Sequence, residues 1–271
     1  MQLLWSKTIR ELNPWGPDYA GVFCKIHGHV NFLYKTPKGP QILSENWELP
    51  NPLCPNSAGV YFPLPQQWIL VENEASAYLF FTDNLVLNLS EMKLCDQPDK
   101  VVLEKYHTLR KPNMYYLEAP FDFGEYRISH KGYFGYQCTR NGIPAWTFKG
   151  QGYLYTDIVR WNDRLYFGTA GQGGYFYILN LVTGEALTKI KTGGTVFIVR
   201  RGGVCYILHN EKHAKLLCID LTDGSIRNEV ALPGQSCKDS MLKEIDGRIH
   251  AITFEMKRSF IQHVYWNCVE I

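Results

Sequence analysis

The sequence contains no long hydrophobic run. The first residues, from Met1 to Lys7, lack the basic segment followed by an apolar stretch that marks a secretory signal, and no later run approaches the length of a membrane span. The net charge is +2 at neutral pH, so the chain also lacks the charge excess that draws proteins to nucleic acids or membrane surfaces. We therefore expect a cytoplasmic protein with no nucleic-acid or membrane partner.

The cysteines and histidines show no spacing typical of a metal site. The eight cysteines are widely scattered and no two are adjacent, and several lie in strand-like runs, where a thiol behaves as a small hydrophobic side chain. His27 and His29 flank a glycine and could hold a metal from one side of a strand, but no second ligand pair with zinc spacing accompanies them. We expect reduced thiols and no bound metal.

Sequence signatures of common catalytic sites are missing as well. No Gly-x-Ser-x-Gly elbow for a nucleophilic serine occurs. The segment Gly168–Gly174 is rich in glycine, but a second strand-like run follows it, not the Lys-Ser or Lys-Thr pair and helix of a phosphate-binding loop. We interpret this segment as a turn between strands.

Helical periodicity is hard to find in the chain. Short alternating or apolar runs dominate, and aromatic residues make up 14% of the chain, including 17 tyrosines. Aromatic and β-branched side chains suit a half-buried pleated surface. We predict an all-β fold in one domain covering residues 1–271, with the strand register of residues 100–125 left open.

A repeat of about 40 residues runs through the chain. It is clearest in two units, Arg164–Gly184 and Gly203–Gly224, each with an apolar strand, a second strand ending in Asn-Leu or Asp-Leu, and a glycine. Gly184 and Gly224 are 40 residues apart, and Gly142 precedes Gly184 by 42. Weaker copies occupy the N-terminal half. A period of this length is typical of a propeller built from four-stranded blades.

The Asn-Leu-x-x-Gly or Asp-Leu-x-x-Gly pattern predicts a hairpin. The side chain of Asn or Asp bonds the turn backbone, and the glycine takes the left-handed conformation that a type I turn with a bulge requires. Markers of the pattern fall at positions 39, 92, 142, 184 and 224, which leaves room for one more unit. We predict a single β-propeller of about six four-stranded blades, with seven blades as the alternative.

The two ends of the sequence complement each other. The last unit reaches residue 271 without a returning strand, and residues 3–9 resemble the strand that follows Gly142 in an earlier unit. Pairing the N-terminal strand into the last blade would close the ring and remove the exposed edges of an open array.

The repeat resembles a known family. The run Arg-Leu-Tyr-Phe-Gly-Thr at 164–169, followed by Tyr-Ile-Leu-Asn-Leu-x-Thr-Gly at 177–184, is similar to the repeat of pyrrolo-quinoline-quinone-type (PQQ-like) β-propellers, most closely over residues 125–255. The resemblance implies a propeller, a fold that serves cofactor enzymes, assembly scaffolds and binding proteins alike. Quinone enzymes of the family carry an export signal, adjacent cysteines and a calcium ion held by carboxylates. None of these features is present, so we expect no cofactor and no catalysis.

Polar runs of successive units are the candidate binding regions. His209–Lys215, Pro233–Lys238 and Glu255–Arg258 recur at similar points, and loops on a rigid scaffold are where binding residues usually lie. Their excess of positive charge would attract an acidic patch on a protein partner; solvated turns are the alternative interpretation. The predicted partner-binding residues are Lys212, His213, Gln235, Lys238, Lys257 and Arg258.

These observations favour a monomeric, non-catalytic propeller that binds a protein. Small propellers with degenerate repeats and no export signal occur among bacterial immunity proteins, which neutralise toxins, so this resemblance suggests a cognate toxin as the partner. The alternative is an enzyme or a carbohydrate-binding lectin that uses the central cavity of the propeller.

Overall fold

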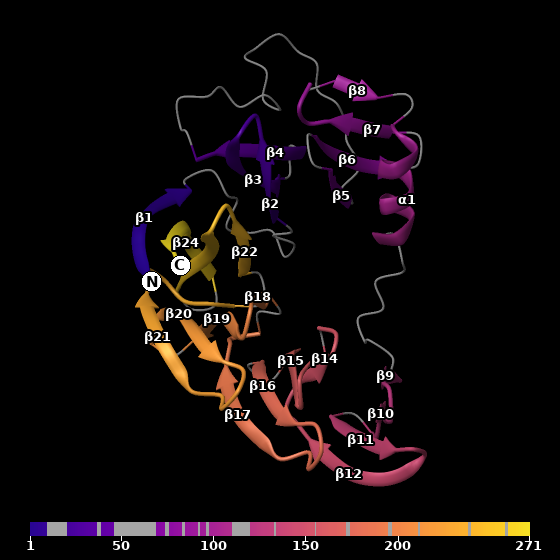
Figure 1. Cartoon of the computed structure of the whole chain (residues 1–271). Coiled ribbons are helices and arrows are strands. Elements are labelled where there is room, and N and C mark those ends of the chain that lie inside the picture. The colour runs from indigo at the N-terminus through magenta and orange to yellow at the C-terminus, as the bar shows by residue number, and fades with distance from the viewer. Residues whose placement is uncertain are drawn as a thin grey trace. The chain divides into compact units, whose positions relative to one another are not determined.

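A computed structural model describes the chain apart from residues 10–20, 37–38, 46–68, 74–75, 83–84, 92, 96–97, 110–119, 133, 155, 172–173, 195–196, 211, 238–239 and 258–259. The chain divides into two compact units, which are described separately (Figure 1). Unit 1 comprises residues 1–14 and 114–271, and unit 2 comprises residues 15–113. The formation of one domain by the whole chain stays a prediction.

Unit 1 contains four antiparallel sheets in its described residues. The β9–β12 sheet consists of β9 (Phe121–Phe123), β10 (Tyr126–His130), β11 (Gly135–Arg140) and β12 (Ile143–Lys149). The β13–β17 sheet consists of β13 (Tyr153–Leu154), β14 (Val159–Trp161), β15 (Arg164–Ala170), β16 (Tyr175–Asn180) and β17 (Ala186–Lys191). The β18–β21 sheet consists of β18 (Val199–Arg201), β19 (Val204–Asn210), β20 (Ala214–Asp220) and β21 (Ile226–Ala231). The terminal sheet consists of β22 (Met241–Ile245), β23 (Arg248–Lys257), β24 (Phe260–Glu270) and β1 (Gln2–Ile9).

The middle strands of the β13–β17 and β18–β21 sheets are buried on both faces. Leu165 and Phe167 of β15 belong to the core shared with the β9–β12 sheet, whereas Tyr166, between them in sequence, belongs to the core shared with the β18–β21 sheet. A third core joins the β18–β21 sheet to the terminal sheet and includes Leu216 and Ala251. Successive side chains of a strand point to opposite faces. A sheet covered on both sides therefore needs apolar residues throughout, which explains the continuous apolar runs in the sequence.

The N-terminal strand completes the terminal sheet. β1 pairs antiparallel with β24, from Gln2 opposite Glu270 to Ile9 opposite Val264, so the two terminal strands lie side by side in Figure 1. Leu3 of β1 packs against the third core. The pairing confirms the prediction that the first residues supply the missing strand of the last unit. The closed ring and its number of blades stay predictions.

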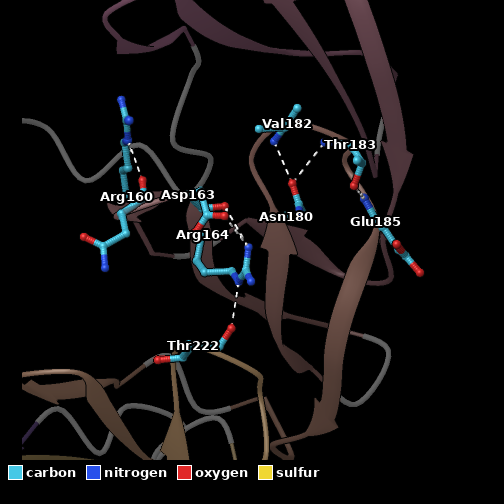
Figure 2. Close-up of polar contacts among 9 residues, drawn as sticks. Arg160, Asp163, Arg164, Asn180, Val182, Thr183, Glu185 and Thr222 are labelled. Carbon is cyan, nitrogen blue, oxygen red and sulfur yellow. Dashed lines mark hydrogen bonds and ion pairs between the residues drawn. The ribbon is translucent and has the colours of Figure 1, made fainter.

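The hairpin turn of the repeat is built as its sequence predicts. Oδ1 of Asn180 accepts hydrogen bonds from the backbone N–H groups of Val182 (2.8 Å) and Thr183 (3.1 Å), as Figure 2 shows. Oδ1 of Asp220 accepts the N–H of Thr222 in the same way at 2.7 Å. These contacts confirm the turn-bonding role predicted for Asn and Asp in the repeat.

Gly184 is required both by its backbone and by its neighbour. Its φ of 73° lies in the left-handed region, and a Cβ atom there would lie 2.4 Å from Cδ2 of Trp146 in the preceding sheet. Nε1 of Trp146 donates a 2.8 Å hydrogen bond to the carbonyl of Leu181. One sheet later, Oγ1 of Thr188 donates to the carbonyl of Gly224 at 2.9 Å. The last strand of each of these two sheets therefore docks on the hairpin turn of the next sheet.

Unit 2 has two described sheets and one helix. The first sheet consists of β2 (Gly21–Ile26), β3 (His29–Thr36) and β4 (Gly39–Ser44), and the second of β5 (Ile69–Glu72), β6 (Ala77–Thr82), β7 (Leu85–Asn88) and β8 (Lys93–Cys95). Leu33 and Leu79 belong to the core between the two sheets. Together with unit 1, these sheets confirm an all-β architecture with several four-stranded antiparallel sheets.

The helix α1 (Lys100–Leu109) is a departure from the expectation of strands alone. Val102 and Tyr106 are buried against one face of the second sheet of unit 2, and the Tyr106 ring stacks on Phe80 with ring centroids 4.1 Å apart. The helix has 10 residues and places these two buried side chains one turn apart. The periodicity of such a short pattern does not distinguish a helix from a strand.

Deletion of residues 1–9 should destabilise the chain severely. The deletion leaves the edge of β24 unpaired and removes the packing of Leu3 and Ile9, and burying side chains of this kind contributes roughly 1.5–3 kcal/mol each, against a total of about 5–15 kcal/mol. Urea unfolding followed by circular dichroism should show a greatly reduced transition or an aggregated product. The control is Leu4→Ser, because Leu4 is 39% exposed on the same strand. An unchanged unfolding midpoint for the deletion would disprove the role of β1.

Gly184→Ala should cost more stability than Gly142→Ala. Both glycines have a left-handed φ, 73° and 79°, but no atom lies within 4 Å of a Cβ placed at Gly142. We expect a loss of about 1 kcal/mol for Gly142→Ala from backbone strain alone. We expect a loss of about 3 kcal/mol for Gly184→Ala, since Trp146 must also move and give up its hydrogen bond. Equal losses in urea unfolding would show that the tryptophan contact contributes nothing.

Candidate partner-binding surface

The strands of unit 1 run between two ends. The hairpin end carries turns such as residues 202–203 and 221–225 of the β18–β21 sheet and residues 162–163 of the β13–β17 sheet. The connection end carries the turns at the opposite ends of the strands, such as residues 212–213, and the links from one sheet to the next, such as residues 232–237. The described residues of all three predicted binding runs fall at the connection end.

Hydrogen bonds tie the segments of the connection end into one framework. Oγ of Ser236 donates to the carbonyl of Thr192 at 2.7 Å, in a buried contact that joins two successive links between sheets. Gln235 and Phe254 exchange two backbone hydrogen bonds of 2.7 and 2.9 Å. The link at residues 232–237 is therefore held both by the preceding link and by β23.

Three of the predicted residues meet where two of the runs touch. Lys212 and His213 form the exposed turn between β19 and β20, and Gln235 lies in the link between β21 and β22. Nε2 of Gln235 donates a weak 3.5 Å hydrogen bond to the carbonyl of Lys212. The structure thus brings together two runs through residues that are 23 positions apart in the sequence.

The third predicted run is strand where a loop was expected. β23 extends through Lys257, and its pairing with β24 shifts register between Glu255 and Met256. An irregularity of this kind bends a strand and increases its twist. Lys257 is exposed at the end of the strand. The remaining predicted residues, Lys238 and Arg258, lie outside the described residues, and their part in the surface stays a prediction.

The connection end also carries exposed lysines that are not among the predicted partner-binding residues. Lys149 and Lys191 are the last residues of β12 and β17, and Lys131 follows β10. Nζ of Lys189 donates a 2.8 Å hydrogen bond to Oε1 of Gln151, which joins the β13–β17 sheet to the link that precedes it. A lysine at the end of the returning strand was visible in the repeat, but only the sheet topology shows that these residues share an end with Lys212.

Charges at the hairpin end are used inside the fold. Nε of Arg164 donates to the carbonyl of Thr222 in the next sheet at 3.0 Å, and its Nη1 pairs with Oδ2 of Asp163 at 2.9 Å (Figure 2). Nε of Arg160 donates to the carbonyl of Asn162 at 2.8 Å. These guanidinium groups hold the turns in place, so fewer of their donors are available to a partner than at the connection end.

Two buried thiols of unit 1 are held in their protonated form, and metal-ligating clusters are not found among the described residues. Burial raises the pKa of Cys205 to about 12 and raises the pKa of Cys138 above its ordinary value, which keeps both thiols protonated and poorly nucleophilic at neutral pH. Within the described ranges, no three His, Cys, Asp or Glu side chains gather as a metal ion would need. No helix in this part of the chain is long and apolar enough to cross a membrane.

Comparisons with known proteins find similarity in structure only. No protein-family model matches the chain, and no curated protein matches it in sequence. Among solved structures, BamB from Moraxella catarrhalis is similar, with 11% identity, 97% of this chain and 99% of that chain covered, and a TM-score of 0.37. The WD40 β-propeller domain of Doa1 has 11% identity, 90% and 77% coverage and a TM-score of 0.33. The dihydro-heme d1 dehydrogenase NirN has 12% identity, 92% and 58% coverage and a TM-score of 0.37. At these TM-scores the likenesses carry nothing about the function of this chain.

Ser236→Ala should loosen the connection end. The variant removes a buried 2.7 Å hydrogen bond to the carbonyl of Thr192, and such a loss typically costs about 1–2 kcal/mol. Hydrogen exchange measured by mass spectrometry should become faster in peptides covering residues 192–194 and 232–237. The control is Ser6→Ala, since Ser6 is exposed on β1. Exchange at the wild-type rate in those peptides would show that the Ser236 contact does not hold the links together.

Proposed function

We propose that the chain is a non-catalytic β-propeller that binds a protein partner through the connection end of unit 1. The observation that carries the proposal is the placement of Lys212, Gln235 and Lys257, which come from three separate segments and lie on one hydrogen-bonded framework. A surface that is already ordered loses little conformational entropy when a partner binds, which favours affinity.

Support for the propeller comes from the packing of unit 1. Its four sheets follow one another along the chain, and neighbouring sheets share a core. The N-terminal strand joins the last of them by pairing with β24. Repeated four-stranded sheets that pack face to face, with the chain ends paired in one sheet, are the arrangement that propellers use to protect their edges. A ring of about six blades is part of the proposal.

The charge of the surface indicates an acidic partner. Lys212, His213 and Lys257 are exposed, and a positive surface attracts a negative one at long range. Such attraction raises the association rate more than the final affinity. The buried thiols of Cys138 and Cys205 stay protonated and are not activated nucleophiles, which is compatible with binding as the function of the chain.

The more specific form of the proposal is a monomeric cytoplasmic immunity protein whose partner is a toxin. An immunity protein acts by covering the toxin, so it needs a complementary surface and no catalytic group. The test is to purify the chain with the toxin encoded beside its gene and to assay the toxin alone and in the complex. A stable complex with lost toxin activity is the expected result, and full toxin activity with no complex would contradict this form of the proposal.

Charge reversal at Lys212 and Lys257 should slow binding of the partner. The partner is first identified by chemical crosslinking and mass spectrometry, and its association with the chain is then followed by surface plasmon resonance at low and high salt. We expect the double variant Lys212→Glu and Lys257→Glu to associate about tenfold more slowly at low salt, with a smaller difference at high salt because added ions screen exposed charges.

A matched control comes from unit 2. The double variant Lys93→Glu and Lys100→Glu has the same net charge, and both lysines are exposed. It should associate at nearly the wild-type rate. Thermal melting curves confirm that each variant is folded. If the variant of Lys212 and Lys257 is folded and keeps the wild-type rate and affinity at low salt, the connection end is not the binding surface.

A further inference from the structure

In the described residues of unit 1, arginine and lysine occupy opposite ends. The described arginines of this unit all lie at the hairpin end, in or beside its turns: Arg127, Arg140, Arg160, Arg164, Arg200, Arg201, Arg227 and Arg248. The connection end carries lysines: Lys131, Lys149, Lys189, Lys191, Lys212, Lys215 and Lys257. The two other described lysines of the unit, Lys7 and Lys243, are only partly exposed and lie within β1 and β22.

The two ends also differ in their acidic residues. The hairpin end carries nine in the described part of the unit: Asp122, Glu125, Asp163, Glu185, Asp220, Asp223, Glu244, Asp246 and Glu270. The described residues of the connection end include three: Asp157, Glu229 and Glu255. Counting described residues alone, eight arginines against nine acids give −1 at the hairpin end, and seven lysines against three acids give +4 at the connection end.

Ion pairs at the hairpin end are made within the unit. Nε of Arg140 pairs with Oε2 of Glu125 at 2.8 Å, and Arg227 pairs with Asp220. The backbone N–H of Thr222 and the guanidinium of Arg227 hold the pKa of the Asp220 carboxyl below its usual range. These arginines therefore act as internal ties between strands and turns.

The lysines of the connection end are mostly directed to solvent. Lys215 pairs with Glu229 at 2.9 Å. Within the described part of the chain, no ion pair is formed by the exposed residues Lys131, Lys149, Lys191, Lys212 and Lys257. The positive charge of this end is consequently available to an external partner.

We infer that the whole connection end of unit 1, from Lys131 and Lys149 through Lys191 to Lys212 and Lys257, is one docking face for an acidic protein surface. The inference rests on the proposed function and extends its contact across the two sheets that precede the predicted loops. Continuity follows from the bonds that link the sheets at this end, from Lys189 to Gln151 and from Ser236 to Thr192.

The chemistry of the face favours carboxylates on a protein over a nucleic acid. Lysine is a compact point charge on a flexible stem, which adapts to an irregular array of carboxylates, whereas arginine is the usual choice for bidentate recognition of phosphate. The described arginines of this unit all lie at the other end. An excess of four charges is also small for a surface that follows a phosphate backbone, where affinity depends on neutralising many phosphates.

The test compares two variants with the same net charge. In the first, Lys131, Lys149 and Lys191 are each changed to Gln. In the second, Ile143, Val182 and Asn228, which are exposed near the hairpin end, are each changed to Glu. Binding is measured by fluorescence anisotropy at low ionic strength with three probes: an oligoglutamate peptide, a single-stranded oligothymidylate of equal charge, and vesicles of phosphatidylcholine and phosphatidylglycerol. Melting curves confirm that both variants are folded.

Wild-type chain should bind the oligoglutamate peptide more tightly than the other two probes. The lysine variant should bind the peptide about tenfold more weakly, from three exposed charge contacts, and the hairpin-end variant should bind as wild type. Any one of four results overturns the inference. These are an equal loss of peptide binding in both variants, unchanged peptide binding by the lysine variant, tighter binding of oligothymidylate or vesicles than of the peptide, and no binding of the peptide by the wild-type chain.

The variant Lys212→Glu with Lys257→Glu separates this inference from the proposed function. If that variant loses binding of the identified partner and of the peptide while the variant of Lys131, Lys149 and Lys191 binds both normally, the extended face is wrong and the proposed function stands. If neither variant loses binding, the surface assigned under the proposed function is wrong as well.

Discussion

Burial of middle strands between neighbouring sheets is the constraint on which the rest of unit 1 depends. Leu165 and Phe167 point into one shared core and Tyr166 into the next, so β15 has no exposed face. Apolar packing of this kind is the largest favourable contribution to folding, and it occupies the strands completely. In the β13–β17 and β18–β21 sheets, the exposed charged residues are left to the outer strands and to the two ends of the unit.

The same packing explains the fixed residues of the turns. Adjacent sheets approach closely enough for Trp146 of one sheet to cover Gly184 of the next and to donate a hydrogen bond to the carbonyl of Leu181. A side chain at Gly184 would hold the two sheets apart. The glycine of the repeat therefore serves the turn and the sheet-to-sheet contact together, and a single marker in the sequence reports on both.

Features that depend on local chemistry were predictable from the sequence. The turn bonds of Asn180 and Asp220 follow from residues two positions apart. The pairing of β1 with β24 follows from the repeat, because the last unit lacks a returning strand and the first residues resemble that strand. The helix α1 was not predictable, because Val102 and Tyr106 are a single pair of buried positions. The contact between Gln235 and Lys212 depends on how neighbouring sheets are aligned, which a repeat pattern does not specify.

The division between arginine and lysine has a physical cause in the two kinds of end. The hairpin end exposes the carbonyl groups of tight turns, and a guanidinium group can donate to several of them at once, as Arg164 does to the carbonyls of Thr222 and Asp163. A lysine placed there would satisfy fewer acceptors, since its ammonium group lacks the planar fork of arginine. The connection end satisfies its backbone with backbone and hydroxyl donors, as Ser236 does for Thr192. Lys189 and Lys215 bond Gln151 and Glu229 there. The exposed residues Lys131, Lys149, Lys191, Lys212 and Lys257 form no ion pair among the described residues, so their accumulation at one end is better explained by an interaction outside the chain than by the needs of the fold.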